Sequence, residues 1–287
     1  MDLYNKIEKL RSEKQSWTIV AAFTSIFMVF TFVRMTLFSL IFLVVVLISF
    51  SKVKDCNKKI QKVYKNEFLY GILNQYFDNV IFNWEGGFLP DEIKKMGLNR
   101  MGNRFFSEDY ISAVYNGVAF QQAEVKIQNV TGTGENRSVQ TYFKGRVFVF
   151  EYGMKDVIST MVFSKNYMYE GRGIGLKYNK VEMESVGFNQ QFVVKSARDI
   201  DAFFVLTPQI MECINILKNK YGNVAFHFTP LRVYVAYNTT ENAFDLDTRK
   251  KLDLGLERER REKDIAVIID LINALQISNN RDGEQIS

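Results

Sequence analysis

From residue 15 to residue 51 the only charged side chain is that of Arg34. It separates two uncharged segments, Gln15–Val33 and Met35–Ser51. At 1.5 Å per residue each would form a helix about 26–28 Å long, close to the roughly 30 Å hydrocarbon core of a bilayer. We therefore predict a two-helix transmembrane hairpin over residues 15–51. A single tilted span and a re-entrant hairpin are the alternatives.

Basic residues lie on both outer flanks of this stretch. Those before it are Lys6, Lys9, Arg11 and Lys14, and those after it are Lys52, Lys54, Lys58, Lys59, Lys62 and Lys65. Because cytoplasmic flanks carry the excess of Lys and Arg, both ends are predicted to be cytoplasmic. The six lysines after the stretch form a predicted membrane-surface basic cluster, which would attract an anionic inner leaflet. The net charge of +5 is thus concentrated beside the apolar stretch, which disfavours nucleic acid as a partner.

The rest of the chain is too apolar for a disordered protein, at 47% hydrophobic residues overall. We predict an α+β membrane protein whose soluble part is a mainly antiparallel sheet with packed helices. Its strongest strand signal is Asn116-Gly117 between two β-rich runs, which is typical of a hairpin turn. The expected divisions are a cytoplasmic N-terminal segment (1–14), the transmembrane hairpin (15–51), a basic amphipathic stalk helix (52–79), a cytoplasmic α+β domain (80–276) and a flexible tail (277–287).

Local patterns give the expected elements of the α+β domain. Strands are predicted within 79–88, 109–115, 118–128, 139–152, 157–164, 180–185, 187–195, 224–228 and 232–237. Helices are predicted at 89–97, 199–206 and 208–221, and a charged stretch at 247–264 leads into a C-terminal helix whose apolar face begins at residue 265. The helix at 208–221 has the clearest boundaries, because Thr207 is a good N-cap, Pro208 suits the first turn and Gly222 ends it.

No catalytic, cofactor or metal site is predicted. The only histidine, His227, lies in an apolar strand, so a multi-histidine metal site is excluded within one chain. Glu182 and Glu184 alternate with apolar residues, which fits a solvated strand face better than an acid/base pair. The remaining candidate is a ligand-binding loop with glycines that would let backbone N–H groups approach an anion: Gly171, Arg172, Gly173 and Gly175.

Several segments occur in an order that resembles a known family. They are FKGRVFVF at 143–150, FNQQFVV at 188–194, LTP at 206–208 and RVYVA at 232–236, after the two apolar segments and the basic stalk. Together they resemble the bacterial membrane family catalogued as domain of unknown function 3137. The resemblance implies a bacterial inner-membrane protein, multi-pass, with its main domain in the cytoplasm, and it implies no activity.

These observations favour a membrane-anchored, non-catalytic binding or scaffold protein whose cytoplasmic domain recognises a ligand or partner. The expected partners are a bilayer with an anionic inner leaflet and a protein, or a second copy of the chain. One alternative is a structural subunit of a larger membrane complex. A second is an enzyme acting on a membrane-associated substrate through carboxylates such as Glu182 and Glu184.

Overall fold

The computed structural model describes residues 2–33, 38–151, 157–167, 176–240 and 244–274. The chain divides into two compact units. We call Met1–Gln75 together with Ala243–Asp264 the hairpin unit, and Tyr76–Asn242 together with Ile265–Ser287 the sheet unit. The segment Ala243–Asp264, which we expected in the soluble α+β domain, therefore belongs to the hairpin unit.

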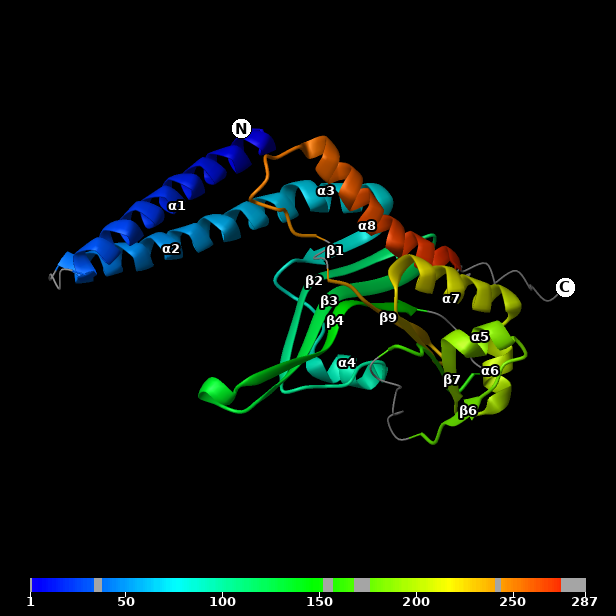
Figure 1. Ribbon diagram of the computed structural model, residues 1–287. Helices are drawn as coiled ribbons and strands as arrows, with labels where there is room; N and C mark the ends of the chain where they lie inside the picture. The colour runs from blue at the N-terminus through cyan, green and yellow to red at the C-terminus, as the bar shows by residue number, and fades with distance from the viewer. Residues whose placement is uncertain (1, 34–37, 152–156, 168–175, 241–243, 275–287) are drawn as a thin grey trace. The chain divides into compact units, whose positions relative to one another are not determined.

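The hairpin unit is built on two long antiparallel helices, α1 (Leu3–Val33) and α2 (Phe38–Val63), which lie side by side in Figure 1. Phe27 of α1 and Phe42 of α2 stack with ring centroids 5.9 Å apart. Helix α1 begins at Leu3, so the predicted N-terminal segment is part of that helix. The predicted stalk is helical, but it is not uniform: α2 passes into a π-helical turn, η1 (Tyr64–Leu69), and then into α3 (Tyr70–Tyr76).

The sheet unit contains a nine-stranded sheet among the described residues. Its strands are β1 (Asp78–Asn83), β2 (Arg104–Tyr115), β3 (Val118–Thr131), β4 (Ser138–Glu151), β5 (Thr160–Ser164), β6 (Asn179–Val181), β7 (Phe192–Ser196), β8 (Val224–Phe228) and β9 (Arg232–Asn238). The order across the sheet is β1-β2-β3-β4-β9-β8-β5-β7-β6, and all recorded pairs are antiparallel.

One feature of this topology follows from local sequence. Asn116 and Gly117 both have positive φ (48° and 77°), as the predicted two-residue turn between β2 and β3 requires. The β8–β9 hairpin instead inserts between β4 and β5, where it joins the first four strands to the last three. A short 3₁₀ turn, η2 (Gly134–Asn136), lies between β3 and β4.

Five helices complete the described fold: α4 (Pro90–Met96), α5 (Val186–Gln191), α6 (Asp199–Val205), α7 (Pro208–Tyr221) and α8 (Leu254–Ala274). The predicted caps of α7 are present, since the Thr207 side chain accepts a hydrogen bond from the Ile210 N–H and Gly222 follows the last residue. Helix α4 ends at Gly97, whose left-handed φ of 71° suits glycine. Residues of α8 through Asp264 lie in the hairpin unit, and those from Ile265 lie in the sheet unit.

One prediction of secondary structure was wrong. We expected a strand from residue 187, but Val186–Gln191 forms α5 and β7 begins only at Phe192. Ser185 caps this helix by accepting from the Phe188 N–H, and the Asn189 side chain bonds both backbone groups of Met183. Local polar contacts of this kind override the strand preference of an apolar run.

The two faces of the sheet are covered by different helices. On one face, α4 packs with a core that includes Ile93, Met96, Val125, Val147 and Phe163. On the other, Tyr237 of β9 stacks on Tyr221 of α7 with centroids 5.3 Å apart. Helix α8 joins α7 there, because Asp270 accepts hydrogen bonds from both Tyr221 and Lys220.

Candidate membrane interface

The outer surface of the hairpin is apolar along the predicted membrane stretch. Large hydrophobic side chains are exposed on both helices: Ile19, Val20, Phe23, Ile26, Phe27, Val29, Phe30 and Phe32 on α1, and Leu40, Ile41, Leu43, Val44, Leu47, Ile48 and Phe50 on α2. The buried positions of this stretch are smaller, Ala21, Val46 and Ser49. The hairpin thus presents its largest apolar groups outward, which is the reverse of a water-soluble helix pair.

Three hydroxyl groups within the described part of the apolar stretch bond to the backbone of their own helices. Thr24 donates to the Val20 carbonyl at 2.6 Å, Ser25 to that of Ala21 at 2.7 Å, and Ser49 to that of Val45 at 2.8 Å. A hydroxyl bonded in this way needs no water, so it can be transferred into hydrocarbon at low cost.

The two helices differ in how well they match a bilayer. Among the described residues, one single helix, Leu3–Phe32, is long and apolar enough to cross a membrane, and 6% of its most apolar 18-residue segment is buried. Helices α6 and α7 taken together are also long and apolar enough for one span, although the angle between them is 77°. The described uncharged part of α2 runs from Phe38 to Ser51 and is only about 21 Å long. The predicted membrane hairpin of two full spans is therefore not confirmed. The apolar N-terminal helix α1 is confirmed.

At the other end of the hairpin the two helices are joined by a small core. Ile7 of α1 and Ile60 and Tyr64 of α2 and η1 pack with Leu246 and Leu252 from the segment before α8. We call this region the base of the hairpin. Gln61 binds the backbone of Leu246 twice, through its Nε2 to the carbonyl oxygen at 2.8 Å and through its Oε1 to the N–H at 3.0 Å.

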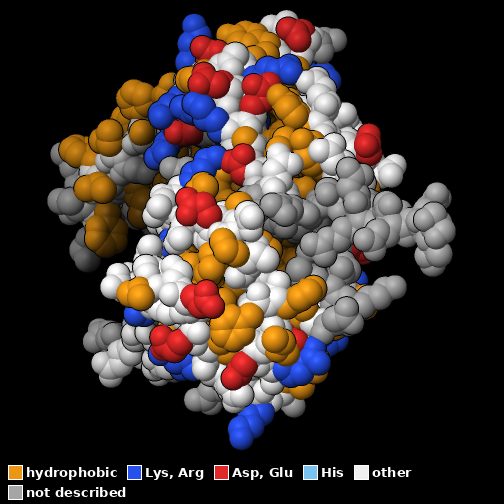
Figure 2. Space-filling model, turned by 90° about the vertical axis from the view of Figure 1, so that its right-hand side faces the viewer, with side chains coloured by type: hydrophobic (Ala, Val, Ile, Leu, Met, Phe, Trp, Pro, Cys, Tyr) orange, Lys and Arg blue, Asp and Glu red, His pale blue; other side chains and the backbone are white. Residues whose placement is uncertain are grey.

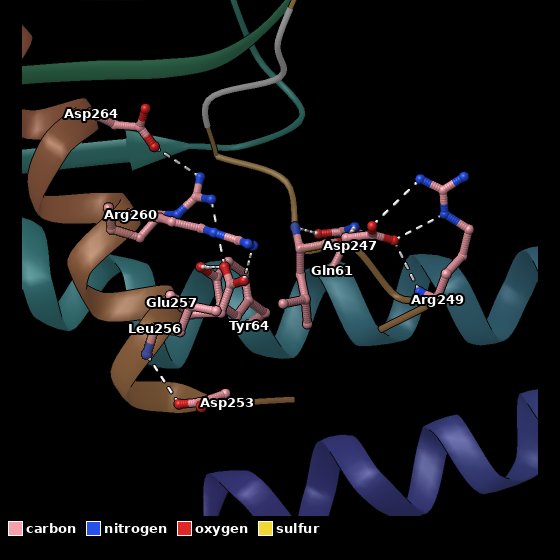
Figure 3. Close-up of polar contacts among 11 residues, drawn as sticks. Gln61, Tyr64, Asp247, Arg249, Asp253, Leu256, Glu257, Arg260 and Asp264 are labelled. Atoms are coloured by element: carbon pink, nitrogen blue, oxygen red, sulfur yellow. Dashed lines mark hydrogen bonds and ion pairs between the residues drawn. The ribbon is translucent and has the colours of Figure 1, made fainter. Parts of the chain in front are cut away.

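A buried ionic cluster fixes the first turns of α8 to η1 (Figure 3). Glu257 is 6% exposed and pairs with Arg260 at 2.8 Å and with Arg261 at 3.5 Å. The Tyr64 hydroxyl donates to the same carboxylate at 3.3 Å. Burial, and then the Glu257 charge, raise the pKa of Tyr64, so this hydroxyl keeps its proton. The shared carboxylate therefore holds the segment 244–264 against the base of the hairpin.

Five of the six lysines in the predicted basic cluster lie on α2 with exposed side chains: Lys52, Lys54, Lys58, Lys59 and Lys62. Lys65 differs from them. It lies in the π-helical turn, is 2% exposed and pairs with Asp245 at 2.6 Å. We therefore leave Lys65 out of the basic surface considered below.

The other predicted candidates do not form a site within the described residues. Gly171, Arg172, Gly173 and Gly175 lie outside those residues. Glu182 and Glu184 are exposed, and the hydrogen bond from Lys180 to Glu182, at 2.8 Å, lowers the pKa of that carboxyl. A general acid needs a raised pKa, so the solvated-face interpretation fits better. Over the described ranges no group of three or more His, Cys, Asp or Glu side chains is arranged to hold a metal ion.

His227 lies in a buried hydrogen-bonded chain that the sequence did not indicate. Its Nδ1 is 2.7 Å from the Met96 carbonyl oxygen, so Nδ1 donates and Nε2 accepts from the Ser159 hydroxyl, also at 2.7 Å. Tyr178 bonds the same Ser159 oxygen at 2.7 Å. Burial lowers the pKa of His227 to about 4, so the ring is neutral. With Ser159 only 2% exposed, this chain attaches α4 to the sheet.

Exposed apolar side chains of the sheet unit are arranged differently from those of the hairpin. Helix α6 exposes Ile200, Phe203 and Phe204. In Figure 2, which looks onto the side that carries α5, α6 and α7 in Figure 1, orange hydrophobic groups alternate with blue and red charged ones. This pattern is ordinary for a protein surface in water. The long uncharged apolar surface is a property of the hairpin.

Comparison with known proteins gives a family match over part of the chain. No curated protein matches the sequence. Among solved structures, the crystal structure of the mycobacterial trehalose monomycolate transport factor A, TtfA, has 9% sequence identity and a TM-score of 0.37, over 72% of this chain and 93% of that one. Residues 138–277, from β4 to the end of α8, match the family described as a protein of unknown function, DUF3137. The predicted resemblance to that family is therefore confirmed for these residues.

Proposed function

We propose that this chain is a membrane-anchored, non-catalytic binding or scaffold protein. In this proposal α1 and α2 insert together into the bilayer, the base of the hairpin lies at the headgroup layer, and the sheet unit recognises a ligand or partner. One observation carries it: the exposed surface of the hairpin is uncharged and apolar from Ile19 to Phe32 and from Leu40 to Phe50.

The position of the basic residues supports a single orientation. Because Ile7 packs on Ile60, the basic residues of α1 and the lysines of α2 lie at the same end of the hairpin. Under the positive-inside rule that end is cytoplasmic, so both termini and the sheet unit are cytoplasmic in this proposal. In a bacterium this corresponds to a multi-pass inner-membrane protein.

The shorter apolar part of α2 can be accommodated at the membrane surface. Lys52 and Lys54 follow it directly, and their long aliphatic stems can lie along hydrocarbon while the ammonium groups reach the headgroups. A bilayer can also thin locally around a short span at a modest cost. The exposed lysines of α2 would then face anionic lipid, with up to about 1 kcal/mol gained for each.

The anchor is tested by placing charge on the apolar surface. Ile26→Lys with Phe30→Lys changes two exposed side chains of α1 (67% and 58% exposed). In water such a change is tolerated, whereas at the centre of a membrane helix each lysine costs about 3 kcal/mol. We expect the wild type to resist alkaline carbonate extraction of membranes and this variant to be extracted or degraded.

Leu231→Lys with Ile200→Lys is the matched control, because both side chains are equally exposed but lie in the sheet unit. We expect this control to stay in the membrane pellet. Extraction of the wild type, or retention of the Ile26 and Phe30 variant, would show that the hairpin is not inserted.

Two observations on the same proteins separate a recognition domain from a complex subunit. A partner that co-purifies in mild detergent with both the wild type and the hairpin variant is bound by the sheet unit. A partner that is lost with the hairpin variant is bound through the helices, as expected for a structural subunit whose small and hydroxyl residues pack against other spans.

A further inference from the structure

A cavity of about 330 Å³ lies where the charged base of the hairpin meets its apolar part. Helix α1 and the segment before α8 supply its walls, which are formed by Arg11, Lys14, Gln15, Thr18, Ile19, Thr248 and Arg249. All of these residues belong to the hairpin unit. Three of the side chains are cationic, and Ile19 is the first large exposed hydrophobic residue of the membrane stretch.

The three cations are not equivalent. Arg11 is 7% exposed and pairs with Glu8 at 3.0 Å, and Arg249 pairs with Asp247 at 3.0 Å. Lys14 has a different environment. Its Nζ donates to the Thr248 hydroxyl at 2.9 Å and to the Thr248 carbonyl oxygen at 3.4 Å, both of which are neutral.

The position of Thr248 is itself fixed by α2. The Thr248 hydroxyl donates to the Asn57 side-chain oxygen at 3.0 Å, so its lone pairs face the Lys14 ammonium. Lys14 is therefore held in place beside two guanidinium groups, and the hydrogen bonds of its ammonium among the described residues go to the two neutral Thr248 oxygens, while the Asp247 carboxylate attracts it from a longer range. A charged donor fixed before a ligand arrives loses little conformational entropy on binding.

We propose that this cavity binds a phosphate group, presented by an anionic lipid headgroup. A phosphate supplies negative charge and several acceptor oxygens, which suit a lysine and an arginine that converge from two elements. This inference depends on the proposed function, because an inserted hairpin is what brings the cavity to the depth of the headgroups. It goes beyond diffuse attraction of the exposed α2 lysines, since it assigns one site with a defined occupant.

The test compares two variants that remove the same charge. Lys14→Gln with Arg249→Gln changes the cavity, and Lys9→Gln with Lys263→Gln removes two exposed cations of α1 and α8 that neither line it nor belong to the α2 lysine surface. Binding of short-chain phosphatidylglycerol and phosphatidylcholine to the detergent-purified full-length chain is titrated by native mass spectrometry. Inorganic phosphate and glycerol 3-phosphate are titrated in parallel to detect a soluble ligand.

We expect the wild type to prefer phosphatidylglycerol, and the cavity variant to lose affinity for it by about tenfold or more, the size expected for a charge-assisted contact. The control variant should change by less than about threefold, which is under 1 kcal/mol. Equal losses in both variants, or no preference for phosphatidylglycerol in the wild type, would overturn the proposal. Binding of glycerol 3-phosphate as tight as that of the lipid would overturn the assignment to a headgroup and leave a soluble phosphate ester as the ligand.

Carbonate extraction of the same variants separates this inference from the proposed function. A cavity variant that stays in the membrane but binds phosphatidylglycerol weakly supports both. A wild type that is extracted by carbonate contradicts the anchor, whatever the lipid titration gives.

Discussion

At the residue scale, Glu257 shows how one carboxylate can join distant parts of the hairpin unit. It is reached by Tyr64 from η1 and by Arg260 and Arg261 from its own helix. Removing one partner of a buried ion pair is costly because the remaining charge stays buried without compensation. The side chain of Arg261 is only 6% exposed, and without Glu257 its buried charge would keep, among the described residues, only the Asp264 carboxylate, 3.0 Å away, as an ion-pair partner.

Glu257→Gln should therefore destabilise the hairpin unit by about 3 kcal/mol. Glu259→Gln is the control in the same helix, since Glu259 is 61% exposed and pairs with Lys263 at 2.7 Å on the surface. We expect little change from that substitution. Thermal unfolding of the detergent-purified chain measures both, and equal midpoints for the two variants would contradict the buried role of Glu257.

His227 should make the stability of the sheet unit depend on pH. Its pKa is about 4 in the folded chain, against 6.5 when it is unfolded. The unfolded state binds a proton first, so the contribution is fully present above pH 6.5 and is lost as the pH falls toward 4. The loss is up to about 3 kcal/mol, since one pKa unit corresponds to about 1.4 kcal/mol.

The check is urea unfolding of the wild type and of His227→Gln at several pH values. The variant should be less stable at neutral pH, because the contacts with Ser159 and Met96 are altered. The difference between the two proteins should then shrink from pH 6.5 to pH 4, and a constant difference would show that His227 does not titrate as proposed. His227 is the only histidine of the chain, so the assignment is unambiguous.

At the element scale, the contact between β4 and β9 requires a glycine. A Cβ at Gly145 would lie 1.9 Å from the Tyr237 carbonyl oxygen and 2.9 Å from the Asn238 Cα. Both are backbone atoms of the neighbouring strand, so neither can move without disturbing the ladder. This gives a physical reason for the glycine in the Phe143-Lys144-Gly145 segment on which the family resemblance partly rests.

Gly145→Ala should destabilise the sheet unit by about 3 kcal/mol or more, at the upper end of overpacking effects. Gly187→Ala is the matched control, because Gly187 lies in α5 and a Cβ there would meet nothing within 4 Å. Alanine at that position should be neutral or stabilise by up to about 1 kcal/mol. Yield and thermal midpoint of the two variants measure this, and a stable Gly145→Ala protein would contradict the close approach of the strands.

Also at the element scale, secondary structure was predicted well where the signal is local. The β2–β3 turn depends on Asn116 and Gly117, and α7 on Thr207 and Pro208, so a few adjacent residues determine each. The prediction failed at α5, where Ser185 and Asn189 satisfy backbone groups and turn an apolar run into a helical turn. Side-chain hydrogen bonds of this kind depend on geometry that periodicity does not report.

At the scale of the whole molecule, the proposed orientation makes a prediction about access. In a variant without Cys56 and Cys213, one cysteine is introduced at Arg34 or at Lys9. A membrane-impermeant maleimide applied to cells with a permeabilised outer membrane should label Arg34→Cys and not Lys9→Cys, because both ends of the hairpin are proposed to be cytoplasmic. Lysis should expose Lys9→Cys, and labelling of Lys9→Cys before lysis would reverse the orientation.

The sequence alone determined features that depend on composition and on neighbouring residues. These are the apolar stretch with its flanking lysines, the α+β class, most strands and caps, and the family resemblance, which the comparison confirms over residues 138–277. Only the tertiary structure decided what depends on contacts between distant segments. It placed β9 and β8 between β4 and β5, assigned Ala243–Asp264 to the hairpin unit, removed Lys65 from the basic surface and brought Lys14 to Thr248. The reason is physical: periodicity records which face of an element is buried, but not which distant element covers that face.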